Sequence, residues 1–431
     1  MKRRRTRDDE LICSFCGRSS DEVPMLPGPD GNICVDCVKR ANELISVGEA
    51  VKKGGDEPPP LPPTPTPKEI KKFLDQYVIG HDEVKKVLAV AVHNHYRRLE
   101  ATAAAQKGKE RKPAPAGYAG YDDVEIEKSN ILLIGPTGCG KTLLAKTLAK
   151  MLGVPFAIGD ATVLTQAGYV GEDVENLVRY LLQNADGDVQ LAQRGIIYVD
   201  EIDKIASKTD NVSITRDVGG EGVQQTLLKI VEGTICRIPP KGGRKHPDQE
   251  YIEVDTSNIL FICGGAFVGL DRIVAARRGH GVVGFGASSF AKATEDKLAA
   301  GAVNPQDVRP EDLVKYGLIP EFTGRLPVIT TMKDLSEEDL VRVLTEPKNS
   351  LVKQYRKLLA MDGVSLEFEP AALKSLAKAA LSRGTGARGL RAEMERLMTD
   401  IMYEAPGSDS MREVKVTAEM VENPAAAKAA G

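Results

Sequence analysis

The sequence predicts an α/β fold in three parts: an N-terminal zinc-binding module, a larger module with a parallel sheet, and a small C-terminal domain that is α+β or helical. Three observations predict it. Two Cys-x-x-Cys pairs lie between Cys13 and Cys37, short apolar runs alternate with helical segments from residue 121 to about 330, and from Ser336 onward the pattern reads helix, strand, helix, helix, strand. Such alternation indicates a mostly parallel sheet that is covered on both faces.

The composition is typical of a globular chain that can bury a core. Of the 431 residues, 42% are hydrophobic and 28% are charged. Lys and Arg total 58 against 61 Asp and Glu, so the net charge is −3, which argues against a protein that coats nucleic acid or an anionic membrane. No apolar run approaches the roughly 18–20 residues that span a bilayer. Asp8, Asp9 and Glu10 stand where a signal peptide would need apolar residues, so we expect a cytoplasmic protein with reduced thiols.

Changes of composition divide the chain. Gly54-Gly55 is followed by seven prolines between Pro58 and Pro67, and such a stretch forms an extended, semi-rigid linker. Residues 101–120 are of low complexity and indicate a tolerated surface insertion. The expected boundaries are 1–53 for the zinc-binding module, 54–68 for the linker, 69–330 for the large domain with the parallel sheet, 331–423 for the small domain and 424–431 for a tail.

Apolar periodicity predicts the elements within these boundaries. Residues Lys68 to Leu99 have helical spacing. Four apolar runs predict the strands Ile131–Ile134, Val154–Ile158, Ile196–Val199 and Ile259–Ile262. Helices are expected at 141–152, 172–184 and 219–232, and two strands of the small domain at Val364–Phe368 and Val414–Val416.

A phosphate-binding loop follows the first of these strands. The run Gly135-Pro-Thr-Gly-Cys-Gly-Lys141-Thr142 matches G-x-x-x-x-G-K-S/T and opens a predicted helix. Glycines allow backbone N–H groups to surround phosphate oxygens at a helix N-terminus, the lysine reaches the β- and γ-phosphates, and the threonine hydroxyl holds Mg²⁺. The residues expected around the nucleotide here are Gly135, Pro136, Thr137, Gly138, Cys139, Gly140, Lys141, Thr142 and Leu143.

A pair of acids supports this prediction. The apolar run Ile196–Val199 ends in Asp200 and Glu201. Asp200 would coordinate Mg²⁺, usually through water, and Glu201 would polarise the attacking water. The sequence therefore predicts hydrolysis of a nucleoside triphosphate.

The four N-terminal cysteines predict a structural metal site. Cys13, Cys16, Cys34 and Cys37 form Cys-x₂-Cys, seventeen residues, Cys-x₂-Cys. Paired thiolates at this spacing supply a closed tetrahedral set that suits Zn²⁺ and leaves no open position for catalysis. Zinc would fold a module too small to be stabilised by core burial alone.

Together, the zinc module, the proline-rich linker, the phosphate loop with its acid pair and the small C-terminal domain resemble the ClpX family, the AAA+ unfoldases that feed the ClpP peptidase. The resemblance covers nearly the whole chain. It implies a homo-hexameric ring that uses ATP, Mg²⁺ and Zn²⁺ to unfold tagged proteins, some delivered by adaptors, and to thread them into ClpP.

The resemblance also implies residue roles. Arg325, in Pro320-Glu-Phe-Thr-Gly-Arg325, resembles the arginine finger that acts on the neighbouring subunit's nucleotide, and Arg388, in Gly386-Ala-Arg388, resembles the second sensor. Val78 and Ile79 resemble the segment that packs around the adenine, and Tyr169 and Val170 resemble the pore loop that grips the substrate. Arg244, Lys245 and His246 resemble the basic loop at the pore entrance. Val283, Gly284 and Phe285 resemble the loop that docks on ClpP, in which Ile is more usual than Val at the first place.

The two apolar loops also have a physical interpretation of their own. Glycines on both sides of Tyr169-Val170 free the backbone around a bulky tip, which can push on a polypeptide by shape. Residues 279–286 hold four glycines around three apolar side chains, and an exposed apolar tip commonly marks a partner contact. No G-x-S-x-G or H-E-x-x-H motif is present, so we expect peptide-bond cleavage to be delegated to a partner.

Two other functions stay open. A DNA-handling AAA+ motor would require a basic surface and a DNA-binding domain, and the near-neutral charge argues against it. A zinc adaptor that uses nucleotide only as a switch would not need Glu201 and Arg325.

Overall fold

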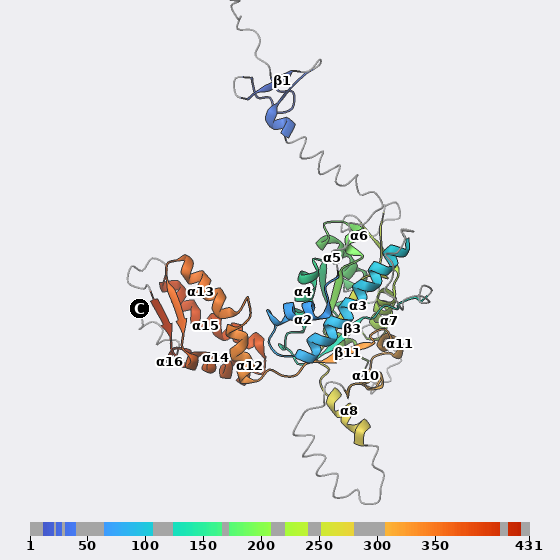
Figure 1. Cartoon of the computed structure of the whole chain (residues 1–431), viewed down its shortest axis with the longest axis vertical. Coiled ribbons are helices and arrows are strands. Elements are labelled where there is room, and N and C mark those ends of the chain that lie inside the picture. The colour runs from blue at the N-terminus through green and yellow to red at the C-terminus, as the bar shows by residue number, and fades with distance from the viewer. Residues whose placement is uncertain are drawn as a thin grey trace, which may run out of the picture. The chain divides into compact units, whose positions relative to one another are not determined.

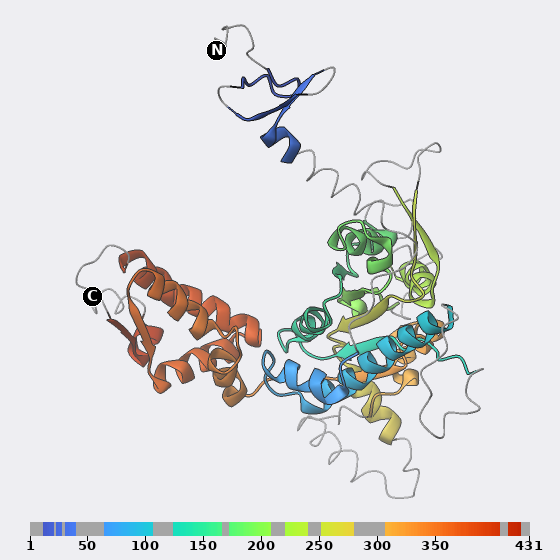
Figure 2. The same ribbon diagram turned by 45° about the horizontal axis from the view of Figure 1, so that its top comes forward.

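The chain forms two compact units, residues 1–61 and 62–431, in this computed structural model (Figures 1 and 2). The structure describes residues 12–20, 23–27, 31–39, 64–106, 124–165, 172–207, 220–239, 251–279, 307–405 and 413–423. No helix in these ranges is long and apolar enough to cross a membrane.

The first unit is organised around its cysteines. Strand β1 (Met25–Pro27) pairs antiparallel with β2 (Asn32–Cys34), and a bridge joins Cys13 to Asn32. Of the apolar side chains described in this unit, only Cys13 and Cys34 are buried. The described part of this unit therefore has almost no apolar core, as expected of a fold that depends on a metal.

The second unit contains a five-stranded parallel sheet in the order β11-β3-β10-β7-β4. Its strands are β3 (Ile131–Ile134), β4 (Phe156–Asp160), β7 (Ile196–Asp200), β10 (Leu260–Gly265) and β11 (Val328–Thr331). Every residue of β3 and β10 is buried, which is typical of a parallel sheet with both faces covered. The predicted fold class is confirmed, and β11 is a fifth strand that the sequence did not predict.

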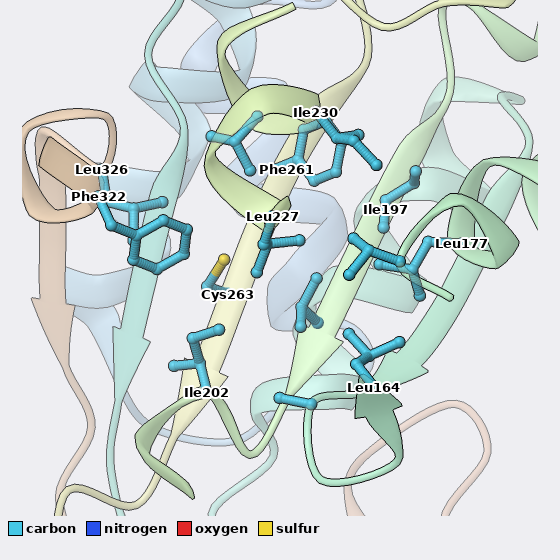
Figure 3. Close-up of a cluster of buried hydrophobic side chains, with 14 of the residues drawn as sticks. Leu164, Leu177, Ile197, Ile202, Leu227, Ile230, Phe261, Cys263, Phe322 and Leu326 are labelled. Carbon is cyan, nitrogen blue, oxygen red and sulfur yellow. The ribbon is translucent and has the colours of Figure 1, made fainter. Parts of the chain in front are cut away.

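Helices and short strands surround this sheet. They are α2 (Pro67–Asp75), α3 (Asp82–Gln106), α4 (Lys141–Leu152), β5 (Leu164–Thr165), β6 (Glu172–Asp173), α5 (Glu175–Asn184), α6 (Val189–Ala192), the 3₁₀ helix η1 (Ile202–Ile205), α7 (Glu221–Glu232), the antiparallel pair β8 (Ile235–Ile238) and β9 (Ile252–Asp255), α8 (Leu270–Gly279), α10 (Pro310–Tyr316) and α11 (Pro320–Gly324). Figure 3 shows how side chains such as Leu177, Leu227 and Phe322 pack with Ile197 and Phe261 of the sheet into one core.

The structure refines two helix predictions. The residues with helical spacing from Lys68 to Leu99 form two helices, because Gly80 and His81 both have positive φ, 68° and 56°, which no α-helix accommodates. The helix expected from residue 172 begins at Glu175, because residues 172–173 pair with β5 instead.

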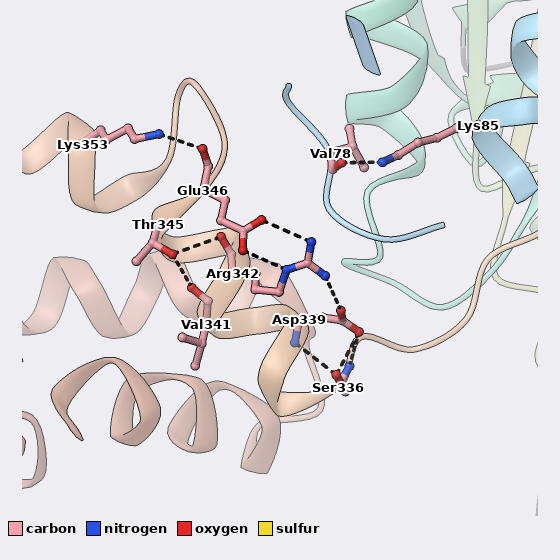
Figure 4. Close-up of polar contacts among 9 residues, drawn as sticks. All are labelled: Val78, Lys85, Ser336, Asp339, Val341, Arg342, Thr345, Glu346 and Lys353. Carbon is pink, nitrogen blue, oxygen red and sulfur yellow. Dashed lines mark hydrogen bonds and ion pairs between the residues drawn. The ribbon is translucent and has the colours of Figure 1, made fainter. Parts of the chain in front are cut away.

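The C-terminal part has an apolar core of its own. Its elements are α12 (Glu337–Thr345), α13 (Leu351–Met361), β12 (Ser365–Phe368), α14 (Pro370–Ser382), α15 (Ala387–Glu404), β13 (Glu413–Val416) and α16 (Ala418–Glu422). Strands β12 and β13 pair in parallel. Two helices precede β12 where the sequence predicted one. The first begins at a capping box between Ser336 and Asp339 and carries the Arg342–Glu346 ion pair (Figure 4).

Candidate active site

The phosphate loop connects β3 to α4. Gly138 and Gly140 have φ of 82° and 103°, so glycine is needed at both positions for the loop to turn into the helix. The Lys141 ammonium is buried and donates to the carbonyl oxygens of Gly135 (2.6 Å) and Pro136 (2.9 Å). The lysine thus lies folded against its own loop at the N-terminus of α4, where backbone N–H groups and the helix dipole favour an anion.

The acid pair lies at the carboxyl end of β7, beside the start of α4. Asp200 Oδ2 accepts a hydrogen bond from Thr142 Oγ1 at 3.0 Å, while Asp200 Oδ1 accepts from the Tyr198 hydroxyl (3.1 Å) and from the Glu201 N–H (3.0 Å). Burial, reinforced by the Asp200 charge, raises the pKa of Tyr198, so the phenol keeps its proton and acts as a donor. The structure therefore brings Thr142, which follows Lys141, into contact with Asp200, which precedes Glu201.

Glu201 has an unusual backbone. Its φ of 54° is rare for a residue with a side chain, and it is exposed. Within the described ranges its carboxylate has no hydrogen-bond partner, so both oxygens can accept from water. That freedom is what a residue that activates water requires.

Asp203 is a buried acid that the sequence analysis did not single out as a site residue. Its Oδ1 accepts from the Ala266 N–H at 3.1 Å, and its side chain is 2% exposed. The bond ties η1, directly after the acid pair, to the end of β10. The only signal in the sequence was its place in the run Asp200-Glu-Ile-Asp203.

The segment expected beside the adenine lies between α2 and α3. Val78 and Ile79 are both buried, and the Lys85 ammonium donates to the Val78 carbonyl at 2.7 Å (Figure 4). Tyr77 lies within cation–π distance of Lys150, on α4, and of Lys348. The segment thus contacts the helix that begins at the phosphate loop.

The first turn of α15 contacts the tip of the phosphate loop. The Ala387 N–H donates to the Gly138 carbonyl at 3.2 Å, and a Cβ on Gly138 would overlap the Thr385 carbonyl oxygen. Arg388 follows Ala387, so this predicted sensor lies one residue from a direct contact between α15 and the phosphate loop.

Arg325 lies at the end of α11, where two residues hold it. The buried Asn130 amide donates to the Arg325 carbonyl at 3.0 Å, and Arg325 Nε donates to Glu232 Oε1 at 2.8 Å. In the part of the chain that the structure describes, Arg325 forms no hydrogen bond with the phosphate loop or the acid pair. This position is compatible with action on another subunit and does not place the residue in its own chain's site.

The four N-terminal cysteines meet at one point. Their Sγ atoms all lie within 4.8 Å of one another, and the N–H groups of Cys34 and Cys37 donate to sulfur at 3.3 and 3.4 Å. Four converging thiols, two of which accept hydrogen bonds from backbone N–H groups, fit a tetrahedral Zn²⁺ site.

Several predicted residues lie outside the described ranges. They are the predicted pore-lining residues Tyr169, Val170, Arg244, Lys245 and His246, and the predicted docking residues Val283, Gly284 and Phe285. Their roles stay predictions.

The fold and the site define a class. A phosphate loop and an acid pair at the carboxyl edge of a five-stranded parallel sheet, followed by a separate mostly helical core, are the features of a AAA+ ATPase, here with an additional four-cysteine zinc site. The chain matches the AAA domain (Cdc48 subfamily) over residues 126–329, the ClpX C4-type zinc finger over 11–46, and the C-terminal D2-small domain of ClpB protein over 335–418.

A curated relative narrows the class to a family. The chain is 50% identical over 418 residues to the ATP-dependent Clp protease ATP-binding subunit ClpX of Treponema denticola, and the match covers 96% of this chain and 94% of that protein. The chain belongs to the ClpX family. It is an AAA+ ATPase that uses ATP and Mg²⁺ and carries a zinc finger, so the predicted enzyme class and cofactors are confirmed.

Proposed function

We propose that this chain is the motor subunit of a two-component protease, which recognises protein substrates, unfolds them with ATP and threads them into a ClpP-type peptidase. One observation carries the proposal. A chain with the ClpX-type zinc finger also holds the Thr142–Asp200 contact of a phosphate-loop ATPase at 3.0 Å, beside the exposed acid Glu201.

The roles proposed in ATP hydrolysis follow from the contacts. Lys141 would exchange the carbonyl oxygens of Gly135 and Pro136 for β- and γ-phosphate oxygens. Thr142 and Asp200 would hold Mg²⁺, which neutralises phosphate charge. Glu201 would accept a proton from the attacking water, because its carboxylate is exposed and the backbone N–H bond to Asp200 fixes its position.

The two arginines would stabilise the charge that develops on the triphosphate. Arg388 would act within its own chain, since the adjacent Ala387 already contacts the phosphate loop. Arg325 would act on the neighbouring subunit's nucleotide, which requires a ring, and we propose a homo-hexamer. Arginine fingers are worth roughly 10³–10⁵ in rate.

Substrate handling is assigned to the loops. Tyr169 and Val170 would grip the polypeptide in the pore, and Arg244, Lys245 and His246 would line its entrance. Val283, Gly284 and Phe285 would dock on the peptidase, while the zinc finger would contact substrates or adaptors. The proposal includes no membrane or nucleic-acid partner. It includes the cytoplasmic location that the sequence predicts.

A two-part assay tests the function. A tagged fluorescent protein is incubated with this chain and ATP, first alone and then with purified ClpP peptidase. Loss of fluorescence in the first case and ATP-dependent degradation in the second are expected. ATP hydrolysis without unfolding of any tagged substrate would contradict the proposal, and strand displacement on a DNA duplex would favour the DNA-motor alternative.

A further inference from the structure

Tyr198 is buried beneath the acid pair and reaches it with its hydroxyl. The residue lies on β7 two positions before Asp200, so both side chains project from the same face of the sheet. Tyr198 is 0% exposed, and its hydroxyl donates to Asp200 Oδ1 at 3.1 Å. A buried phenol needs a partner for its O–H, and here the partner is the carboxylate itself.

The hydrogen bonds divide the Asp200 carboxylate into two halves. Oδ1 accepts from the Tyr198 hydroxyl and the Glu201 N–H, whereas Oδ2 accepts from Thr142 Oγ1. A bound cation would need the lone pairs of the Thr142 oxygen and Oδ2, while the two donors on Oδ1 can remain in place. Oδ1 is therefore the anchored oxygen and Oδ2 the available one.

The neighbouring strand is shaped to admit this hydroxyl. A Cβ on Gly264 of β10 would overlap the Tyr198 hydroxyl oxygen, and β10 pairs directly with β7. A side chain at position 264 would displace the phenol from Asp200. The glycine is thus explained by close approach of the Tyr198 side chain rather than by a turn.

We propose that Tyr198 is a positioning residue for the metal–nucleotide complex: its hydroxyl fixes the rotation of the Asp200 carboxylate so that Oδ2 faces Thr142. The same anchored oxygen holds the Glu201 N–H, so the bond also supports the positive φ of the water-activating acid. The proposal rests on the proposed role of Thr142 and Asp200 in holding Mg²⁺. A side chain that only filled space at position 198 would not need the hydroxyl.

Binding experiments separate this role from a structural one. Tyr198→Phe keeps the ring and removes the donor. Tyr96→Phe is a matched control, because Tyr96 is also buried and its hydroxyl donates to the Arg194 carbonyl at 3.0 Å. Arg194 precedes the amino end of β7, whereas Asp200 lies at the carboxyl end. Affinity for ADP is measured by calorimetry in EDTA, and affinity of the ADP complex for Mn²⁺ by electron paramagnetic resonance.

Tyr198→Phe should leave ADP affinity in EDTA within about twofold and weaken Mn²⁺ binding by about tenfold, the size expected for one hydrogen bond to a charged group. Gly264→Ala should weaken Mn²⁺ binding at least as much, and Tyr96→Phe should not change it. Thermal melting of each variant checks that the fold is retained.

Three outcomes would overturn the proposal. They are unchanged Mn²⁺ affinity in Tyr198→Phe, an equal loss of ADP affinity with and without metal, and an equal effect of Tyr96→Phe. Asp200→Asn tests the proposed metal site on which this inference rests. If that variant keeps wild-type Mn²⁺ affinity, the assignment of the metal site itself is wrong.

Discussion

At the residue scale, hydrogen bonds that connect three elements hold the candidate site. Thr142 comes from α4, Asp200 from β7, and Glu201 from the turn that follows β7. Each of these residues could be predicted from motif spacing, because a phosphate loop and an acid pair need fixed residue types. Tyr198, Asp203 and Glu232 could not, since their roles depend on which atoms meet after the sheet forms. A tyrosine in an apolar run looks like any other core residue.

The first prediction concerns the acid pair and the lysine of the phosphate loop. Glu201→Gln should leave ATP bound and lower turnover by roughly 10²–10⁴-fold, because an amide cannot take a proton from water. Lys141→Ala should instead weaken ATP binding, since the ammonium is the cation that lies on the phosphate loop. Nucleotide binding and steady-state hydrolysis are measured side by side. Wild-type turnover in Glu201→Gln would exclude this acid from catalysis.

At the element scale, prediction from sequence succeeded for elements with strong local signals and failed for strands that depend on a neighbouring strand. Strand β3 and helix α4 were predicted at their observed bounds, because a fully buried run and a phosphate loop are strong local signals. Strand β11 was missed since only one of its four residues is buried and its extended form depends on pairing with β3. The antiparallel pair β8 and β9 was missed because a segment of more than ten residues separates its strands.

The second prediction concerns a buried ion pair between α8 and α10. Arg277 donates to both Asp312 oxygens at 2.8 and 3.0 Å, and the Asp312 side chain is fully buried. Burial opposes ionisation of Asp312, but Arg277 and the Arg309 N–H outweigh it and lower the pKa of the carboxyl. Arg277→Ala should destabilise the fold by about 3–5 kcal/mol at pH 7, because it leaves a buried carboxylate without its cation.

The pH dependence of this ion pair has a definite sign. A lowered folded-state pKa means that the stabilisation is present above the unfolded pKa of about 3.9 and is lost as the pH falls through the folded value. The difference between wild type and Arg277→Ala in urea unfolding should therefore shrink below about pH 4. Arg278→Ala, which removes a half-exposed ion pair with Asp307, is the control and should cost at most about 1 kcal/mol. A difference that does not depend on pH would show that packing, and not charge, stabilises the contact.

At the scale of the whole molecule, the described residues give the sheet and the C-terminal part an apolar core each, while the first unit relies on a metal. The third prediction concerns that unit. Purified protein should contain one Zn²⁺ per chain, and Cys13→Ser or Cys34→Ser should lose it, because each removes a ligand from a closed set of four. Metal content is measured by atomic absorption.

Removal of residues 1–61, one of the two compact units, should spare ATP hydrolysis and impair some substrate or adaptor contacts. Loss of hydrolysis on truncation would show that the two units depend on each other.

The last prediction concerns the proposed docking segment and connects the motor to its partner. Val283 and Phe285 are apolar residues in a glycine-rich stretch, where folding alone gives no reason for a phenylalanine. If each subunit of a ring places such a tip in an apolar pocket of the peptidase, weak contacts gain strength through effective concentration. Deletion of residues 283–285 should then abolish degradation by the complex and leave ATP hydrolysis and substrate unfolding largely intact, because the phosphate loop and acid pair are untouched. Unfolding without peptidase and proteolysis with it are measured on one fluorescent substrate. An equal loss of both would mean that the segment is structural, and undiminished proteolysis would place the docking surface elsewhere.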